Sequence, residues 1–416
     1  MSFFRELYRF LDSGSRAYAR WDLETSTAII KRRRSLWVLL ALAAPILVFA
    51  VAWGADTPPI LGGKTAYAPA FYTLDIFLAA IAVGFVAGLI TGCIGAGGGF
   101  IITPALMAVG VKGILAVGTD LFHVFAKAIM GTAIHRKLGN VSVKLAVAFL
   151  GGSLVGTVVG GALNKGLYDA DPLLSELFIS SIYAILLGFL GFYSLFDFLK
   201  SKGRATGEAE AEPGKLAARV QSLRIPPMIV FDEKVVRGGR SVSAWIVAAG
   251  GVLVGFLAAI MGVGGGFVTF PMFVYGLGVS AMTTVGTDIF QIIFTAGFAA
   301  IGQYAIYGFV FYTLAIGMLL GSLLGIQIGA LTTTVVSGME IRGFYAVSIL
   351  SGFVNRAAVL PKRLNELEYL SWPDAVVDFI EQAGNVVFWA VVGVFGLWVC
   401  FKFVANLKKL RGGEAC

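Results

Sequence analysis

The sequence predicts an all-α polytopic membrane bundle of about ten spans. Each predicted span is an apolar segment about as long as a helix needs to cross a bilayer. The bundle is expected to consist of two inverted repeats whose glycine-broken half-helices meet near the midplane. Composition is the first observation: the 416 residues are 58% hydrophobic and 13% charged, with mean hydropathy +0.86. Soluble domains carry about 25% charged residues. The second observation is a glycine-rich apolar motif that occurs once in each half.

The repeated motif has the form G-x-G-G-G-F, followed by a proline five residues after the last glycine and later by V-G-T-D. The two copies lie within residues 88–121 and 255–289. The separation of the copies is almost the same at the glycines, Gly99 and Gly266, as at the aspartates, Asp120 and Asp288. A glycine-broken apolar segment at corresponding positions of two halves indicates the binding site of a secondary transporter.

The chain begins with a basic segment, residues 1–35, that we expect in the cytoplasm. Apolar side chains recur there at helical spacing between arginines, which suits an amphipathic helix on the anionic inner leaflet. A solvated tail that packs on the bundle is the alternative. An extra N-terminal span at 36–53 follows the run Lys31-Arg32-Arg33-Arg34, and such a run stays inside. No cleavable signal peptide is evident.

The first transmembrane repeat is expected at 72–199 and the second at 243–360. Between them, 200–242 is a polar, Lys/Arg/Glu-rich cytoplasmic linker without sustained periodicity. An extra C-terminal span at 383–405 and a cytoplasmic tail at 406–416 complete the chain. The predicted spans are 36–53, 72–93, 114–134, 143–164, 175–199, 243–262, 283–306, 310–334, 342–360 and 383–405.

Two further apolar pieces, 99–111 and 266–279, are too short to span as ordinary helices.

Charge predicts how the repeats are oriented. The linker carries nine Lys/Arg, so it lies inside, which places loop 165–174 outside and the basic loop 135–142 inside. Counting forward places the uncharged loop 303–310 outside. Because corresponding loops fall on opposite sides, the repeats should be related by a pseudo-two-fold axis in the membrane plane. We therefore expect a multi-pass protein of the plasma membrane whose two termini are both cytoplasmic.

A pair of glycine ridges, one in each half, supports the same alignment, because the ridges are separated by nearly the same length of chain as the motif copies. Glycine at every fourth position lets two helix backbones approach closely in lipid, so we interpret both ridges as packing surfaces. The ridges are Gly152, Gly156 and Gly160 in the first half and Gly321, Gly325 and Gly329 in the second.

The glycine loops are candidate substrate-binding sites. Their backbone can adopt positive φ, and an unwound stretch in a membrane must line a cavity or be buried in protein. The short helix that follows each loop presents free N–H groups and a partial positive charge, which suit an anion. A hinge or tight crossing without a ligand is the alternative. The candidate residues are Gly97, Gly98 and Gly99 in the first loop and Gly264, Gly265 and Gly266 in the second.

The helix after each loop carries the second half of the predicted site. Asp120, His123 and Lys127 lie on one face at spacings i, i+3 and i+7. An ionisable residue inside a span is a functional candidate by default. Asp120 and Lys127 bridged by His123 would form a self-compensating triad, and a histidine can relay protons near neutral pH. Snorkelling is the alternative for Lys127.

The corresponding positions in the second half are Asp288, Gln291 and Thr295. An alternative for both aspartates is that each caps the N-terminus of its helix. A capping aspartate beside a cavity could also orient the neighbouring Thr119 or Thr287, so both threonines are further candidates.

Paired G-x-G-G-G-F-x-x-x-P segments, each followed by a V-G-T-D helix and a glycine-ridge helix, resemble the sulfite exporter TauE/SafE family of membrane permeases. The resemblance covers about 72–360 and leaves out 1–53, the linker and the final span. Both motif copies are intact, whereas His123 and Lys127 occur in one half only. The resemblance implies a permease for a sulfur-containing anion such as sulfite or an organosulfonate.

The expected function is secondary transport of that small anion by alternating access, with proton or sodium coupling left open. An anion channel and a carboxylate permease are the alternatives. An enzyme is not expected, because the sequence has no metal-ligand cluster and no Ser/His/Asp arrangement, and both histidines lie in one half. The sequence has no phosphate-binding P-loop, so transport is not expected to be driven by ATP hydrolysis on this chain, and no cofactor is expected. The expected partners are the small anionic substrate and the lipid bilayer, with no nucleic acid. A homo-oligomer is left open.

Overall fold

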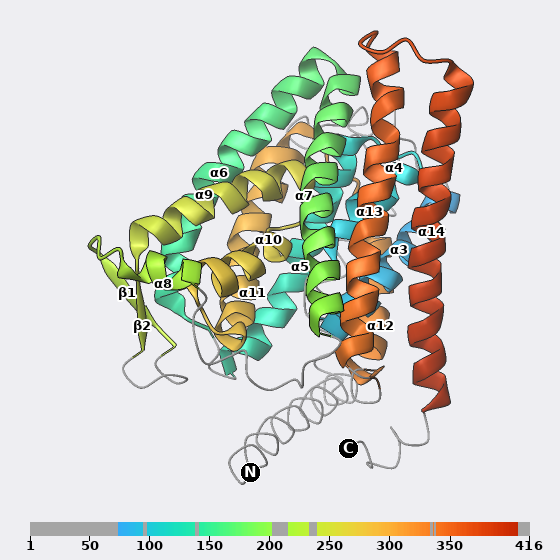
Figure 1. Cartoon of the computed structure of the whole chain (residues 1–416). Helices are drawn as coiled ribbons and strands as arrows, with labels where there is room; N and C mark the ends of the chain where they lie inside the picture. Colours follow the sequence, from blue (N-terminus) through green and yellow to red (C-terminus); the bar gives the residue numbers. More distant parts are fainter. Residues whose placement is uncertain are drawn as a thin grey trace, which may run out of the picture. The chain divides into compact units, whose positions relative to one another are not determined.

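Almost every residue that the structure describes lies in a helix (Figure 1), which confirms the predicted fold class. The structure is a computed structural model that describes residues 74–94, 98–137, 141–201, 215–232, 239–332, 336 and 338–406. All of these belong to one compact unit, Pro58–Cys416. The predictions for 1–35 and 36–53 therefore lie outside the described residues.

Each repeat contains four long helices and one short one. The first repeat holds α3 (Leu74–Ile94), α4 (Gly99–Ala108), α5 (Gly113–Lys137), α6 (Val143–Ala170) and α7 (Pro172–Ser201). The second holds α9 (Ala244–Met261), α10 (Gly266–Pro271) with the π-helix η3 (Met272–Leu277), and α11 (Ala281–Phe298) with η4 (Ala299–Tyr304) and η5 (Ala305–Tyr307). It continues with α12 (Tyr312–Thr332) and α13 (Gly338–Glu366), and α14 (Asp374–Ala405) follows.

Eight helices of the described part are long and apolar enough to cross a bilayer: α3, α6, α7, α9, α11 with its continuation, α12, α13 and α14. The short helices Gly99–Ala108 and Gly266–Leu277 are apolar but shorter, as predicted. Large apolar side chains are exposed on the outer helices, including Ile185 and Phe189 of α7 and Leu397 of α14. Contiguous apolar surface of this kind indicates contact with lipid.

Each glycine ridge packs against a helix of the other repeat. The α6 ridge contacts α9, where a Cβ added at Gly156 would lie 2.7 Å from Phe256 N. The α12 ridge contacts α3, where a Cβ added at Gly88 would lie 2.5 Å from Ser322 O. The predicted packing role is confirmed, because backbone meets backbone without an intervening side chain.

Neighbouring residues show how these helices run. In the α3–α12 pair, Gly88 faces Ser322 and Gly92 faces Ile326, so the two helices are parallel. In the α7–α13 pair, Gly188 faces Phe353 and Gly191 faces Leu350, so these helices are antiparallel. In Figure 1, α6 ends and α7 begins at the top, whereas α12 ends and α13 begins at the bottom. The corresponding helix ends of the two repeats thus lie at opposite ends of the bundle.

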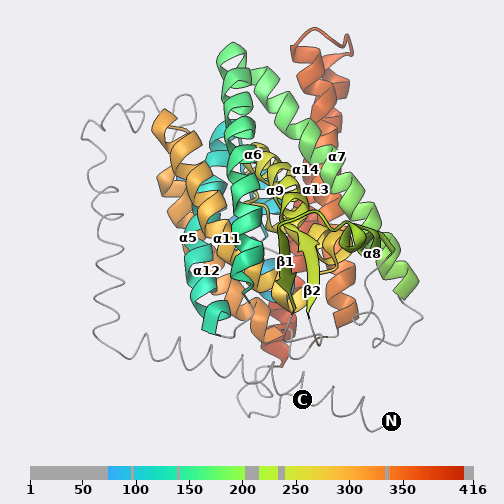
Figure 2. The same ribbon diagram turned by 90° about the vertical axis from the view of Figure 1, so that its left-hand side faces the viewer.

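The segment predicted as a linker contains regular structure, α8 (Lys215–Ser222) and the antiparallel strands β1 (Met228–Phe231) and β2 (Arg240–Ser243), which Figure 2 shows side by side. Ile229, Phe231 and Val242 join an apolar cluster with residues of α6, α9 and η3. Arg240 Nη1 donates to Gly278 O at 2.7 Å, so the hairpin covers the end of η3.

Several helices extend beyond the predicted spans. The predicted loop 165–174 is wrong, because α6 runs to Ala170 and α7 begins at Pro172. Lys165 and Asp169 form an ion pair one turn apart within α6, and such pairs support a helix. Hydropathy marks only the apolar stretch, so it misses polar helical ends like this one.

Candidate functional site at the two glycine loops

The two glycine loops meet inside the bundle. Gly98 (φ 59°) precedes α4 and Gly265 (φ 97°) precedes α10, both in the left-handed region that favours glycine. Immediately inside the helices, the rings of Phe100 and Phe267 stack with centroids 4.9 Å apart. Both rings are buried. The predicted meeting of the half-helices is therefore confirmed.

The remaining loop candidates fit this arrangement. Gly264 also has positive φ, 68°, and Gly266 is the first residue of α10. A Cβ added at Gly99 would lie 3.2 Å from Val263 Cα, so the two loops touch through their backbones. Gly97 lies outside the described residues.

The two aspartates are not helix caps. The helix α5 begins at Gly113 and α11 at Ala281, so Asp120 and Asp288 each lie about two turns inside a helix. The residue that caps α11 is Ser280, whose side chain accepts from Thr283 N. The capping alternative is therefore wrong, and both carboxyls are buried side chains within the bundle.

Asp120 lies between the first half-helix and His123. Thr103 Oγ1 of α4 donates to Asp120 Oδ2 at 3.1 Å. The other oxygen, Oδ1, lies 3.6 Å from His123 Nδ1, and both atoms are buried without a hydrogen-bond partner among the described residues. His123 Nε2 lies 3.1 Å from Ser322 Oγ of α12.

Lys127 points toward the first glycine loop. Its Nζ donates to Thr91 Oγ1 of α3 at 3.3 Å, and a Cβ added at Gly98 would lie 2.8 Å from that same oxygen. His123 does not bridge Asp120 to Lys127 as expected, because its second ring nitrogen faces Ser322. The three side chains of α5 thus contact three different helices: Asp120 contacts α4, His123 contacts α12 and Lys127 contacts α3.

The second cluster continues as a chain of hydrogen bonds. Gln291 Nε2 donates to Asp288 Oδ1 at 2.9 Å, and Thr295 Oγ1 donates to Gln291 Oε1 at 2.7 Å. Thr295 Oγ1 also lies 2.8 Å from Ser153 Oγ of α6. Ser153 and Ser322 occupy equivalent positions, because each directly follows the first glycine of its ridge. Each cluster therefore ends on the same ridge position of the opposite repeat.

Asp288 lies directly at the start of α10. A Cβ added at Gly266 would lie 2.8 Å from Asp288 Oδ2. The N-terminus of a helix carries a partial positive charge, so this carboxyl lies where a negative charge is favoured.

Thr119 and Thr287 hold helix starts in place. Phe311 N donates to Thr119 Oγ1 at 2.9 Å, and Ser142 N donates to Thr287 Oγ1 at 3.0 Å. Phe311 and Ser142 are equivalent, because each directly precedes the first residue of its ridge helix, α12 or α6. Each V-G-T-D threonine thus accepts a backbone N–H at the start of the other repeat's ridge helix, a group that has no partner within that helix.

Comparison with known proteins adds the family. The sequence profile of the family described as "Sulfite exporter TauE/SafE" matches residues 79–355. The chain belongs to the TauE/SafE family. It is similar to "Probable membrane transporter protein YjnA" of Bacillus subtilis, 26% identical over 253 residues, which are 60% of this chain and 87% of the relative.

Other TauE/SafE relatives match to a similar extent. "Probable membrane transporter protein YunE" of Bacillus subtilis is 26% identical over 263 residues, 61% of this chain and 87% of the relative. A "Probable membrane transporter protein" of Xylella fastidiosa is 25% identical over 264 residues, 63% of this chain and 87% of the relative. No solved structure matches the chain significantly. The protein is thus a multi-pass membrane transporter of the TauE/SafE family.

Several polar residues of the TauE/SafE bundle were missed by the sequence reasoning. Thr91, Thr103 and Ser322 contact the α5 cluster, but isolated threonine and serine in apolar segments gave no signal. Asn355 and Arg356 are also buried, which their position late in an apolar segment did not predict. Within the described residues, no group of three His, Cys, Asp or Glu side chains could hold a metal ion.

Proposed function

We propose that this TauE/SafE protein is a secondary transporter of a small anion, a sulfur-containing one such as sulfite or an organosulfonate. The observation that carries the proposal is the meeting of two helix N-termini at Phe100 and Phe267, flanked by two buried polar clusters. Helix N-termini favour anions, and Lys127 adds a cation beside the first loop.

Asp288 supports coupling to protons. Its carboxyl lies beside the start of α10, and two negative charges at one site cannot both remain ionised without strong repulsion. An anion can therefore bind there only when Asp288 is protonated or has moved away. The Asp120–His123 pair, with two unsatisfied buried atoms facing each other, offers a second place for a proton. Both arrangements favour an anion that travels together with protons.

The way the repeats interlock supports alternating access. The tightly packed pairs α3–α12 and α6–α9 each join one helix from each repeat. The corresponding helix ends, those of α6 with α7 and of α12 with α13, lie at opposite ends of the bundle (Figure 1). These features support two inverted repeats, which transporters use to expose one central site alternately to each side. We infer that the α3–α12 and α6–α9 pairs move as rigid units.

The test is anion flux in liposomes that contain the purified full-length protein. Sulfite, thiosulfate, sulfate, taurine, isethionate and succinate would be compared, with and without an imposed pH gradient. We expect saturable uptake of a sulfur anion that is stimulated by the same anion on the opposite side. Unsaturable flux would indicate a channel, and flux of succinate alone would indicate a carboxylate permease.

The coupling is tested with Asp288→Asn, which removes the charge and leaves an oxygen to accept from Gln291. This variant should still exchange the anion but should no longer concentrate it in response to a pH gradient. Asp169→Asn is the matched control, because Asp169 is exposed and pairs only with Lys165 on the same helix. A pH-driven uptake by Asp288→Asn equal to that of wild type would refute proton coupling at this carboxyl.

A further inference from the structure

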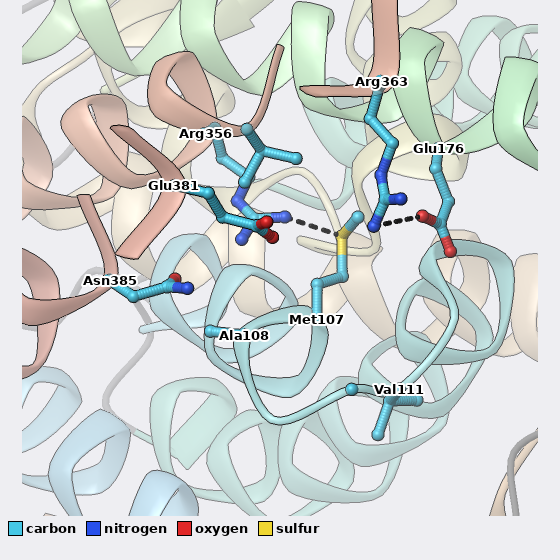
Figure 3. Close-up of a pocket in the computed structure, with 10 residues that line it drawn as sticks. Met107, Ala108, Val111, Glu176, Arg356, Arg363, Glu381 and Asn385 are labelled. Atoms are coloured by element: carbon cyan, nitrogen blue, oxygen red, sulfur yellow. Dashed lines mark hydrogen bonds and ion pairs between the residues drawn. The ribbon is translucent and has the colours of Figure 1, made fainter. Parts of the chain in front are cut away.

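A second feature of the bundle lies at the other end of the half-helix α4. The last turn of α4 borders a small cavity of about 60 Å³, shown in Figure 3. Such a volume suits a few water molecules or one small ion. The walls come from α4 and the turn after it, from the start of α7, and from α13 and α14. They include Met107, Glu176, Arg356, Arg363, Glu381 and Asn385.

Arg356 is the most unusual residue of this cavity, because its side chain is only 2% exposed and all of its hydrogen bonds go to neutral atoms. Its Nε donates to Asn355 Oδ1 at 2.7 Å. Its Nη1 donates to Met107 Sδ at 3.3 Å, and its Nη2 to Pro104 O at 3.4 Å. Thioether sulfur is a weak acceptor. No ion pair found in the described part of the chain includes Arg356.

The carboxylates that line the cavity are already paired with other cations. Glu176 Oε2 lies 3.1 Å from Arg363 Nη2. Glu381 Oε2 lies 2.8 Å from Lys362 Nζ, which also contacts Asp378 at 2.9 Å. Figure 3 shows the Glu381 side chain on the same side of the cavity as Arg356. An arginine remains charged in proteins, and a buried charge without a partner is costly.

We propose that Arg356 binds a small oxyanion in this cavity. The three hydrogen bonds of its guanidinium leave one N–H free on Nη1 and one on Nη2, and such a pair matches two oxygens of a sulfite, sulfate or phosphate group. Asn385 adds its amide N–H groups, because its Oδ1 is the atom that accepts from Asn355. The ligand would therefore give Arg356 a direct ion pair, which the carboxylates lining the cavity make with Arg363 and Lys362 instead.

The position of the cavity suggests the role of this site. Pro104, which accepts from Arg356, lies five residues after Gly99 along α4, or about 7–8 Å at the rise of an α-helix. The Arg356 site is then an intermediate binding site for the transported anion, between the α6–α7 end of the bundle and the glycine loops. This assignment rests on the proposed transport function, whereas anion binding at Arg356 does not.

A purely structural role makes a different prediction. Arg356 could serve only to hold the carbonyl end of α4, where a cation is favourable. Loss of the arginine would then lower stability by the same amount with and without an anion. Binding of a ligand instead predicts a change in the stabilisation that the anion causes.

The experiment places a carboxylate where the ligand should be. In Met107→Glu, a side chain of similar length brings a negative charge to Arg356 Nη1, and Met107→Gln is the uncharged match. Thermal unfolding of the purified full-length proteins in detergent would be followed against sulfate and sulfite at constant ionic strength. We expect wild type to be stabilised, and the apparent anion affinity of Met107→Glu to fall at least about tenfold below that of Met107→Gln.

Equal anion responses in Met107→Glu and Met107→Gln would overturn the Arg356 site, as would a wild type that responds to neither anion. If Met107→Glu does not fold, Arg356→Lys tests the same site, because it keeps the charge and loses the two-pronged donor. Its anion affinity should fall more than that of Arg363→Lys, whose partner is Glu176. Anion flux in liposomes distinguishes anion binding at Arg356 from anion transport. Binding at Arg356 without any flux would support the site and refute the transport function.

Discussion

Replacing Gly156 by alanine should force apart two helices that belong to different repeats. Gly156 lies on the α6 ridge, where an added Cβ would lie 2.7 Å from Phe256 N and 2.9 Å from Val252 C of α9. Both are backbone atoms, so no side-chain rotation can relieve the contact. Ordinary contacts begin at 3.4 Å, and the carbonyl oxygen of Val252 would lie closer still, so the helices must separate by more than about 0.7 Å.

The cost of this separation can be worked out from the loss of dispersion energy. A gap of about 1 Å removes about a half of contacts worth about 0.1–0.2 kcal/mol each, or about 2–4 kcal/mol over roughly 40 atom pairs. Alanine is better than glycine inside a helix by about 1 kcal/mol. We therefore expect Gly156→Ala to destabilise the protein by about 1–3 kcal/mol, similar to other overpacked sites.

The assay is the midpoint of unfolding of the purified protein in detergent as the fraction of SDS is increased. Gly151→Ala is the matched control on the same helix, because Gly151 is exposed and an added Cβ meets no atom within 4 Å. Gly151→Ala should be neutral or more stable than wild type by up to about 1 kcal/mol. A Gly156→Ala protein as stable as Gly151→Ala would refute the close inter-repeat packing.

Two further changes test other parts of the bundle. Phe267→Ala removes the ring stacked on Phe100 and should destabilise the protein by about 3–5 kcal/mol. If the two rings seal the path between the half-helices, liposomes that contain this variant should leak anions without saturation. A leak no larger than that of wild type would contradict this sealing role. Asp232→Ala removes the acceptor of the backbone N–H of Ser280, which donates to it at 2.7 Å, and leaves Ser280 Oγ with Thr283 Oγ1 as its acceptor. The free energy of opening that protects the hairpin from protease should fall by about 1–3 kcal/mol. The control Asp169→Ala, which breaks an exposed ion pair, should change stability by less than about 1 kcal/mol.

The glycine loops were predictable because the signal is local and repeated. Two copies of G-x-G-G-G-F place backbone freedom and a following helix start at the same point of each repeat, and Gly98 and Gly265 indeed take positive φ. The interpretation of Asp120 and Asp288 as helix caps failed for a physical reason. A cap is defined by where its helix begins, and α5 and α11 begin about two turns earlier than the V-G-T-D motif suggests.

The sequence by itself determined the membrane class, the two repeats, the short half-helices and the one-sided spacing of Asp120, His123 and Lys127. These depend on composition and on residue spacing along one helix, which a chain carries without its partners. Only the tertiary structure decided which helices share the glycine ridges, that His123 faces Ser322, and that Arg356 lies buried among neutral acceptors. Apart from the bond of Arg356 to the neighbouring Asn355, each of these contacts joins residues far apart in the sequence. Its energy depends on the distance between atoms that only the packed bundle brings together.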